Sequence, residues 1–515
     1  MDSTATRIIR RLTLGSIAVF MGQGINILGQ ILVVPLFLWA WGPQLYGEWL
    51  ALYAVVAYFS LLDFGMQAYV INRLNQCYSV GQLKDYSCIL HSALVLYLSV
   101  AIVAVSLTTA ALSLAPVEQW LNFKLMDHQI SAIVAIFLAT QIIFAIPQGL
   151  IIGLYRTLGE FPRGATIRNL RQGCTLGFVA LVLLFGGNVI HVAAIQLIPP
   201  LGAVAFALRD LKNRHPELNI GLAQSHWKMA ITFLAPSLLF FLIQISNALI
   251  LQGSIIVVSV FAGSPYVAVF AIHRTLTNLI RQIVGSLNNA LWPELTTLEA
   301  TDNYSLLRVV HRSFVKISFG ICVIAGIWLH FVGKDIMSLW TLGRITFDQR
   351  LLDVFIIYLI FQAPWLASGL FPASFNRHRN LAICYFLSAV SGLGLALGLV
   401  RHLGIVGVAL GLLIADILVC GWFVPLDTCR ILGDNVRKFW VSVAMRGFPV
   451  IALGWVVTRL AIVYISPPIP RILVALASLT LIALCAGYFL WLNKAEKRNI
   501  SSLGTNSWFK VANTK

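Results

Sequence analysis

The chain has 515 residues, of which 59% are hydrophobic and only 11% are charged, and its mean hydropathy is +0.86. A soluble domain carries about 25% charged residues, so this composition excludes a soluble globular protein. The net charge of +17 does not indicate nucleic-acid binding, because the basic residues lie in short segments between apolar runs, where they orient membrane helices.

Apolar segments follow one another along the whole chain, each near the length of about 20 residues that a helix needs to cross a bilayer. This pattern predicts an all-α polytopic membrane protein with fourteen spans: 13–41, 48–71, 87–115, 129–155, 168–187, 189–208, 229–262, 265–293, 313–333, 352–373, 380–400, 404–426, 441–465 and 470–492. The first run continues to Trp41, which is too long for a cleavable signal peptide. Span 229–262 is long, so we expect it to tilt, bend or protrude.

Basic residues are unevenly divided between the two sides of the predicted membrane. With the N-terminus inside, most of the 36 Lys and Arg residues fall on the inner side, and the outer loops hold only Lys124, Lys334, Arg344, Arg350, Arg401 and Arg471. Since cytoplasmic loops carry the excess of Lys and Arg, both termini are predicted to be cytoplasmic.

A polar element recurs in the first and seventh predicted spans. The matched pairs, each 221 positions apart, are Gln23 with Gln244, Asn26 with Asn247, Leu28 with Leu249 and Gly42 with Gly263. Six spans separate the copies, so both would run the same way through the membrane, as in a parallel repeat. We therefore expect one six-helix bundle over 1–208, a second over 209–430, and two additional helices with a cytoplasmic tail over 431–515.

Span 265–293 carries a polar, cationic stripe. At about 100° per residue one face of the helix holds Arg274, Asn278, Arg281, Gly285, Asn288 and Trp292. Ionisable groups inside a membrane usually face a cavity or a partner, and the planar guanidinium suits phosphate. The stripe predicts a track for an anionic head group. The alternative is that its arginines pair with an acid or with carbonyl groups on neighbouring helices.

Amide side chains form further stripes on the first and seventh spans. Gln23, Asn26 and Gln30 lie on the first, and Gln244 and Asn247 lie on the seventh. Such amides could bind sugar hydroxyls in a cavity, or they could hold one helix to another, as amides do in lipid. Both interpretations stay open at this point.

Two acidic residues lie within predicted spans. Asp63 is in the second span, with Ser60 and Gln67 on its face, and Asp416 is in the twelfth. Either could take up a proton or a cation and so couple or gate transport. The alternative for Asp63 is a fixed partner for an arginine.

Nothing in the chain indicates an enzyme. The predicted loops reach only about 20 residues, which leaves no room for a soluble catalytic domain. The sequence contains no G-x-x-x-x-G-K-[ST] loop, no H-E-x-x-H and no G-x-S-x-G. Its eight cysteines form no C-x-x-C pair. We expect no catalysis, no metal site and no cofactor, and a function that lies between the helices.

The segment 42–66, GPQLYGEWLALYAVVAYFSLLDFGM, resembles the O-antigen type polysaccharide flippases of the multidrug/oligosaccharidyl-lipid/polysaccharide exporter superfamily. In that family a glycine and a Y-G-x-W-like turn, here Tyr46 to Trp49, follow the first span. A D-x-G-like element, here Asp63 to Gly65, lies in the second. The segment IIVVSVFAGSPYVAVFA around Gly263 is similar to the family's second half.

The resemblance implies two six-helix bundles around a central cavity, plus two C-terminal helices. It implies that a polyprenyl-diphosphate-linked oligosaccharide moves from the cytoplasmic to the periplasmic leaflet of a bacterial inner membrane, for lipopolysaccharide synthesis. The expected partners are this lipid-linked oligosaccharide, membrane lipids and the polysaccharide polymerase machinery. The alternatives are another exporter of the superfamily, for drugs or for the peptidoglycan lipid precursor, and a membrane glycosyltransferase or polymerase.

Overall fold

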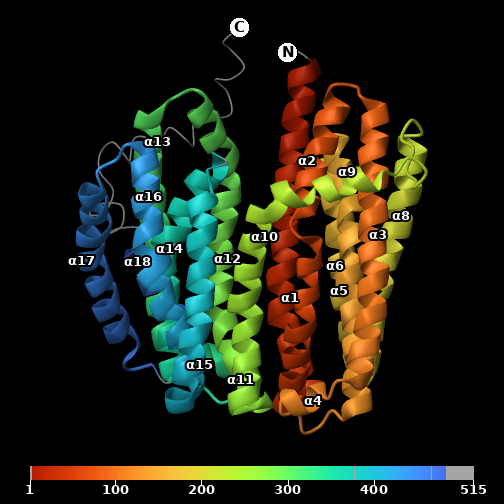
Figure 1. Cartoon of the computed structure of the whole chain (residues 1–515). Helices are drawn as coiled ribbons and strands as arrows, with labels where there is room; N and C mark the ends of the chain where they lie inside the picture. The colour runs from red at the N-terminus through yellow and green to blue at the C-terminus, as the bar shows by residue number, and fades with distance from the viewer. Residues whose placement is uncertain (1–2, 376, 466, 483–515) are drawn as a thin grey trace. The chain divides into compact units, whose positions relative to one another are not determined.

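The computed structural model describes residues 3–375, 377–465 and 467–482, and within these ranges every regular element is a helix (Figure 1). The predicted all-α class is therefore confirmed. The chain divides into two compact units, Met1–Ala268 and Val269–Lys515. Each unit is described by itself below.

The first unit is built from helices that lie side by side. Its elements are α1 (Ser3–Val56), η1 (Ala57–Asp63), α2 (Met66–Ser79), α3 (Leu83–Leu114), α4 (Val117–Trp120), α5 (His128–Thr157), α6 (Phe161–Leu184), α7 (Val189–Ile195), α8 (Ile198–Arg214), α9 (Trp227–Thr232), α10 (Leu234–Ala248), η2 (Leu249–Gly253) and α11 (Ser254–Ala262). α5 packs against α3, α6 and α8, and the short α9 runs across the end of α3 (Figure 1). α10 and α11 pack against α2 and α1, so the predicted seventh span belongs to this unit.

The second unit begins within α12 (Ser264–Ala300). Its further elements are α13 (Tyr304–Trp340), α14 (Gln349–Ser374), α15 (Arg379–Asp416), η3 (Ile417–Gly421), α16 (Trp422–Leu432), α17 (Val436–Ile462) and α18 (Pro468–Ile482). α14 packs between α13 and α15, while α17 and α18 pack on α13 (Figure 1). Its apolar core includes Leu307, Phe371 and Phe439, which are all fully buried.

Each predicted span coincides with a helical segment, except that the end of span 470–492 and the tail lie outside the described residues. Eight stretches of the described chain are long and apolar enough to cross a membrane, judged by length and composition. Two of them, Ile17–Asp63 and Arg379–Leu432, contain a break at Gly42 and at Gly404. Each of these two stretches therefore covers two predicted spans.

Four predicted spans are not single α-helices. Span 189–208 is divided between α7 and α8, span 404–426 contains the π-helical η3, and the second and seventh spans are also broken. The second is interrupted after η1, because Phe64 (φ 48°) and Gly65 (φ 70°) both adopt left-handed conformations before α2 begins. The long span 229–262 is divided into α9, α10, the π-helical η2 and α11, so its extra length is accommodated by breaks.

Large apolar side chains remain on the outside of both units. On α3 the exposed fractions of Ile102 and Leu107 are both 66%, and Leu418 of the second unit is 62% exposed. Water would penalise such surfaces, whereas lipid tails are as apolar as the side chains themselves. The exposed apolar faces are therefore the lipid-facing surface of a multi-span membrane protein.

Candidate functional site

A polar cavity of about 410 Å³ lies within the first unit, among η1, α5, α10 and η2. We name it the amide cavity, because Gln244, Asn247 and Gln252 line it together with Tyr53 and Ser60. The Oε1 atom of Gln244 is buried and has no hydrogen-bond partner among the described residues, whereas the Nδ2 atom of Asn247 donates to the Ile243 carbonyl at 3.0 Å. The two amides predicted on the seventh span therefore do lie beside a cavity that could hold a hydroxyl-rich ligand.

Asp63 lies at the edge of this region, where η1 ends. Its Oδ1 atom accepts a hydrogen bond from the backbone N–H of Gln67 at 3.3 Å, so the carboxylate also organises the start of α2. The side chains of Tyr97 and Gln244 interact with the same carboxylate. The structure thus joins Asp63 to Gln244, which sequence analysis treated as separate features. The partners of Asp63 in the first unit include neutral groups, so its carboxylate does not need the arginine that was the alternative prediction for its partner.

The amides of the first span have a different setting. Asn26 accepts a hydrogen bond from the Nε2 atom of Gln172, which lies on α6. One turn closer to the N-terminus, Asn169 of α6 donates to the Ala18 carbonyl at 2.7 Å. Gln23 and Gln30 do not line the amide cavity. At Asn26 the geometry favours the second interpretation, in which polar groups bind one helix to another.

The cationic stripe lies on α12 and, from Val269 onward, belongs to the second unit. The guanidinium of Arg274 lies 5.6 Å from the ring centroid of Phe270, in cation–π geometry. Arg281 lies close enough to Asp416 for their charges to interact. Asn278 is half-buried, and the Oδ1 atom of Asn288 is buried without a hydrogen-bond partner among the described residues.

Asp416 is fully buried at the end of α15. Its Oδ2 atom accepts a hydrogen bond from the indole N–H of Trp365 at 2.7 Å, while its Oδ1 atom has no hydrogen-bond partner in the described part of the chain. A buried carboxylate with one unsatisfied oxygen is costly, and the hydrogen bond from Trp365 and the nearby charge of Arg281 both compensate this cost. The stripe and Asp416 therefore form one electrostatic group.

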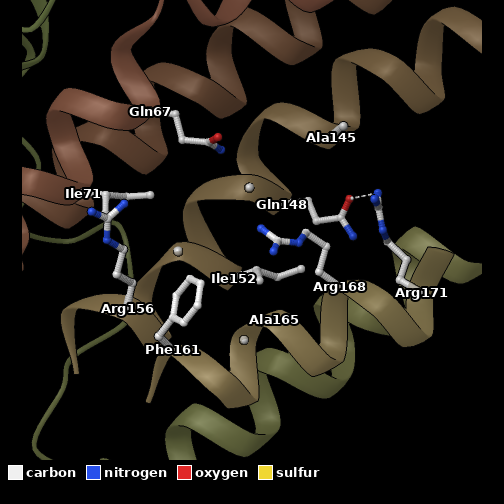
Figure 2. A pocket seen from close by; sticks show the side chains of 13 residues that line it. Gln67, Ile71, Ala145, Gln148, Ile152, Arg156, Phe161, Ala165, Arg168 and Arg171 are labelled. Atoms are coloured by element: carbon white, nitrogen blue, oxygen red, sulfur yellow. Dashed lines mark hydrogen bonds between the residues drawn. The ribbon is translucent and has the colours of Figure 1, made fainter. Parts of the chain in front are cut away.

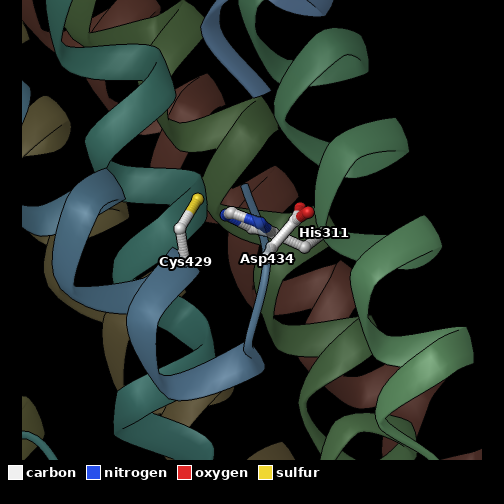
Figure 3. A group of neighbouring side chains, drawn as sticks. All are labelled: His311, Cys429 and Asp434. Atoms are coloured by element: carbon white, nitrogen blue, oxygen red, sulfur yellow. The ribbon is translucent and has the colours of Figure 1, made fainter. Parts of the chain in front are cut away.

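A second group of titratable side chains in this unit comprises His311, Cys429 and Asp434 (Figure 3). Their potential ligand atoms lie within 4.8 Å of one another, as a metal site would require. However, Arg312 donates to both carboxylate oxygens of Asp434, and Ser368 lies 3.0 Å from Nε2 of His311. The imidazole also stacks on Phe439, with ring centroids 5.0 Å apart. These contacts favour an ion pair and a packed aromatic group over a metal centre.

Sequence analysis missed several residues of these sites. Gln252 lies five positions after Asn247, which α-helical spacing would place on another face, and it lines the amide cavity where the π-helical η2 interrupts that spacing. Tyr97 and Trp365 are ordinary aromatic residues of apolar helices, and nothing in the sequence marks their contacts with Asp63 and Asp416.

Long apolar helices that enclose polar cavities and buried charges define a polytopic membrane protein. No protein-family model matches the chain. A Yersinia pseudotuberculosis protein named "Putative O-antigen export protein" is 25% identical over 191 residues, which cover 36% of this chain. The match spans 43% of that relative's length, less than half of it.

Solved structures match over much more of the chain. The lipid II flippase MurJ in an inward closed conformation gives a TM-score of 0.68 at 13% identity, over 92% of this chain and 98% of that one. An inward-facing multidrug resistance MATE transporter of the MOP superfamily gives 0.64 at 16% identity, over 84% of this chain and 99% of that one. The chain therefore has the fold of these solved structures, in line with the predicted resemblance.

Proposed function

We propose that the chain is a flippase that moves a polyprenyl-diphosphate-linked oligosaccharide from the cytoplasmic to the periplasmic leaflet, for O-antigen type polysaccharide synthesis. The observation that carries the proposal is the likeness of its fold to a lipid II flippase over 92% of the chain. The partial match to a protein named for O-antigen export points to the same class of cargo. The host membrane is a bacterial inner membrane, and both termini are cytoplasmic.

The polar groups suit this cargo in kind. Gln244 and Asn247 present amides to the amide cavity, where they would meet sugar hydroxyls. Arg274 and Arg281, with Asn278 and Asn288, would attract the diphosphate as it passes, because a guanidinium matches phosphate oxygens in geometry and charge. In this proposal Gln23 and Gln30 are further sugar contacts. Asn26 is a sugar contact in this proposal only if its hydrogen bond with Gln172 breaks.

Coupling is assigned to the two membrane acids. Asp63 interacts with Gln244, and Asp416 interacts with Arg281. A change in the charge of either carboxylate would therefore alter the interactions of a residue proposed to bind cargo. We propose Asp63 as the coupling residue and Asp416 as a gate on the stripe.

The direct test is the sidedness of lipid-linked oligosaccharide in cells depleted of this protein. Complete units should accumulate on the cytoplasmic leaflet, and the wild-type chain should restore their delivery. Normal delivery in depleted cells would reject the flippase. Periplasmic units that stay unpolymerised would instead indicate a polymerase.

The MATE likeness at TM-score 0.64 supports drug export as the second candidate. Drug susceptibility of the same depleted cells separates the two. Hypersensitivity to cationic drugs together with normal oligosaccharide delivery would replace the proposed cargo with small cations.

A further inference from the structure

A second cavity of the first unit, of about 300 Å³, lies among α2, α5 and α6, near the turn that joins α5 to α6 (Figure 2). Its polar lining consists of Gln67, Gln148, Arg156, Arg168 and Arg171. We name it the arginine pocket. Sequence analysis treated these arginines only as inner-side charges that orient the chain.

The arginine pocket carries positive charge without an acid to balance it. No Asp or Glu lines the pocket, and Arg156 and Arg168 form no ion pair within the described residues. Figure 2 shows the guanidinium of Arg168 directed into the middle of the pocket. Arg171 donates to the Oε1 atom of Gln148 at 3.1 Å, and in the described part of the chain its buried Nε atom has no hydrogen-bond partner. Three arginines therefore line one partly enclosed space.

Two acids of the neighbouring α5–α6 turn and α8 are already bound to other arginines. Asp210 pairs with Arg163, at 2.6 Å, and Glu160 pairs with Arg214, at 2.7 Å. Partial burial alone would raise the pKa of Glu160, but hydrogen bonding and charge from Arg214 outweigh it and hold the pKa below its ordinary value. Neither carboxylate is therefore available to neutralise the arginine pocket. Basic residues that only orient the protein would need to lie on this side of the membrane, but they would not need to line one pocket.

Close helix packing shapes the floor of the pocket. A side-chain carbon placed at Gly149 would lie 1.8 Å from the amide nitrogen of Gln67, and one at Gly153 would lie 2.2 Å from Ile71. These glycines bring α5 against α2 and fix Gln67 at the pocket. Ile71, Ile152 and Phe161 supply an apolar wall beside the charges. The site thus offers hydrogen-bond donors for an anion and an apolar surface for a chain attached to it.

We propose that the arginine pocket binds the phosphate group of a lipid. The guanidinium forks match phosphate oxygens, the carboxamides add neutral donors, and the apolar wall takes the first carbons of the lipid chain. The phosphate assignment stands on the arginine pocket itself. The choice of the diphosphate of the polyprenyl carrier as its source rests on the proposed function, and makes the pocket the site where cargo is received before translocation.

The test measures lipid binding to the purified full chain in detergent by native mass spectrometry. The probes are undecaprenyl diphosphate and phosphatidylglycerol, titrated separately and in competition. The variant is Arg156→Gln with Arg168→Gln, which breaks no side-chain hydrogen bond among the described residues. The matched control is Arg209→Gln with Lys212→Gln, which removes two exposed charges from α8 of the same unit.

We expect the pocket variant to bind undecaprenyl diphosphate at least about tenfold more weakly, since two charge-assisted contacts are lost, and the control to bind within about twofold of wild type. Arg168→Lys keeps the charge but loses the guanidinium fork, so its affinity for undecaprenyl diphosphate should lie between those of the wild type and the pocket variant. Equal losses in both double variants, or none in the pocket variant, would overturn the proposal. An unaltered elution profile in size-exclusion chromatography establishes that the pocket variant is folded.

The competition arm identifies the source of the phosphate. Retention of undecaprenyl diphosphate against excess phosphatidylglycerol supports the carrier lipid, whereas equal displacement overturns that assignment in favour of a bilayer phospholipid. The flippase proposal is tested in a separate experiment, where normal oligosaccharide delivery in depleted cells would reject it. Weakened lipid binding in the pocket variant would still stand in that case.

Discussion

At the residue scale, the two glycines of the predicted repeat adopt almost the same backbone conformation. Gly42 has φ 73° and ψ 174°, and Gly263 has φ 90° and ψ 167°. This region is essentially restricted to glycine. Each glycine ends one long helical segment and turns the chain into the next, so the recurring spacing in the sequence corresponds to a recurring joint in the fold.

Replacing either joint glycine with alanine should therefore destabilise the protein. A side-chain carbon at Gly42 would have no neighbour within 4 Å, so the cost is backbone strain alone, about 1–3 kcal/mol for each substitution. Gly24→Ala is the control, because Gly24 also has open space but lies within a regular helix, where alanine is favoured. Thermal unfolding in detergent should show lower midpoints for Gly42→Ala and Gly263→Ala only. Equal unfolding midpoints for all three variants would contradict the conclusion that the two joints require glycine.

Glu48 is a second residue whose role the sequence did not reveal. It belongs to the Y-G-x-W-like turn, yet its carboxylate is fully buried and accepts backbone hydrogen bonds from Lys124, Leu125 and Met126 at 2.7, 2.9 and 2.8 Å. The turn was recognised by its letters, but its partners lie 76 to 78 positions away. Local pattern contains no information about a contact of that separation.

Glu48→Gln should expose this dependence. An amide offers only one oxygen, so at least one buried N–H loses its acceptor, at a cost of about 1–3 kcal/mol. Amide hydrogen exchange at Lys124 to Met126 should accelerate. Glu118→Gln is the control, since Glu118 pairs only with the exposed His128, at 3.1 Å. Unchanged exchange in Glu48→Gln would mean that other contacts hold this loop.

At the element scale, hydropathy predicted the helices well and their interruptions poorly. Each apolar run became a helix because a membrane leaves the backbone few alternatives. The break at Phe64–Gly65 and the π-helical turns at η2 and η3 depend instead on contacts among helices distant in sequence. The joining of Asp63 to Tyr97 and Gln244 depends on the same tertiary contacts, so the amide cavity could be predicted only in part.

The connection between α8 and α9 is held by α3 through His91. The Nδ1 atom of His91 accepts from the Gln224 N–H at 3.0 Å, and its Nε2 atom lies 2.6 Å from the Asn219 carbonyl oxygen. His91→Ala should release this connection, and we expect exchange at Gln224 to accelerate at least about tenfold, because its N–H loses its acceptor. His402→Ala, at an exposed site on α15, serves as the control. Protection that survives in His91→Ala would make the ring a passive core residue.

At the scale of the whole molecule, the central question is whether the cationic stripe serves transport or merely neutralises Asp416. Sequence analysis left both interpretations open, and the electrostatic proximity of Arg281 and Asp416 gives each of them a physical basis. Arg274 provides a contrast, since its guanidinium lies over the ring of Phe270. The two arginines therefore allow the interpretations to be separated genetically.

We expect Arg274→Ala and Arg281→Ala each to reduce oligosaccharide delivery at least about tenfold, because each removes a charge-assisted contact to the diphosphate. Asp416→Asn keeps an acceptor for Trp365 and should reduce delivery less. The double variant Arg281→Ala with Asp416→Asn decides the matter. If Arg281 binds cargo, the double variant stays as impaired as Arg281→Ala alone. If Arg281 only compensates the buried carboxylate, removing the charge of Asp416 restores delivery in the double variant. Arg281 and Asp416 would then be a structural ion pair, and the loss of Arg281 alone would reduce delivery by destabilising the protein.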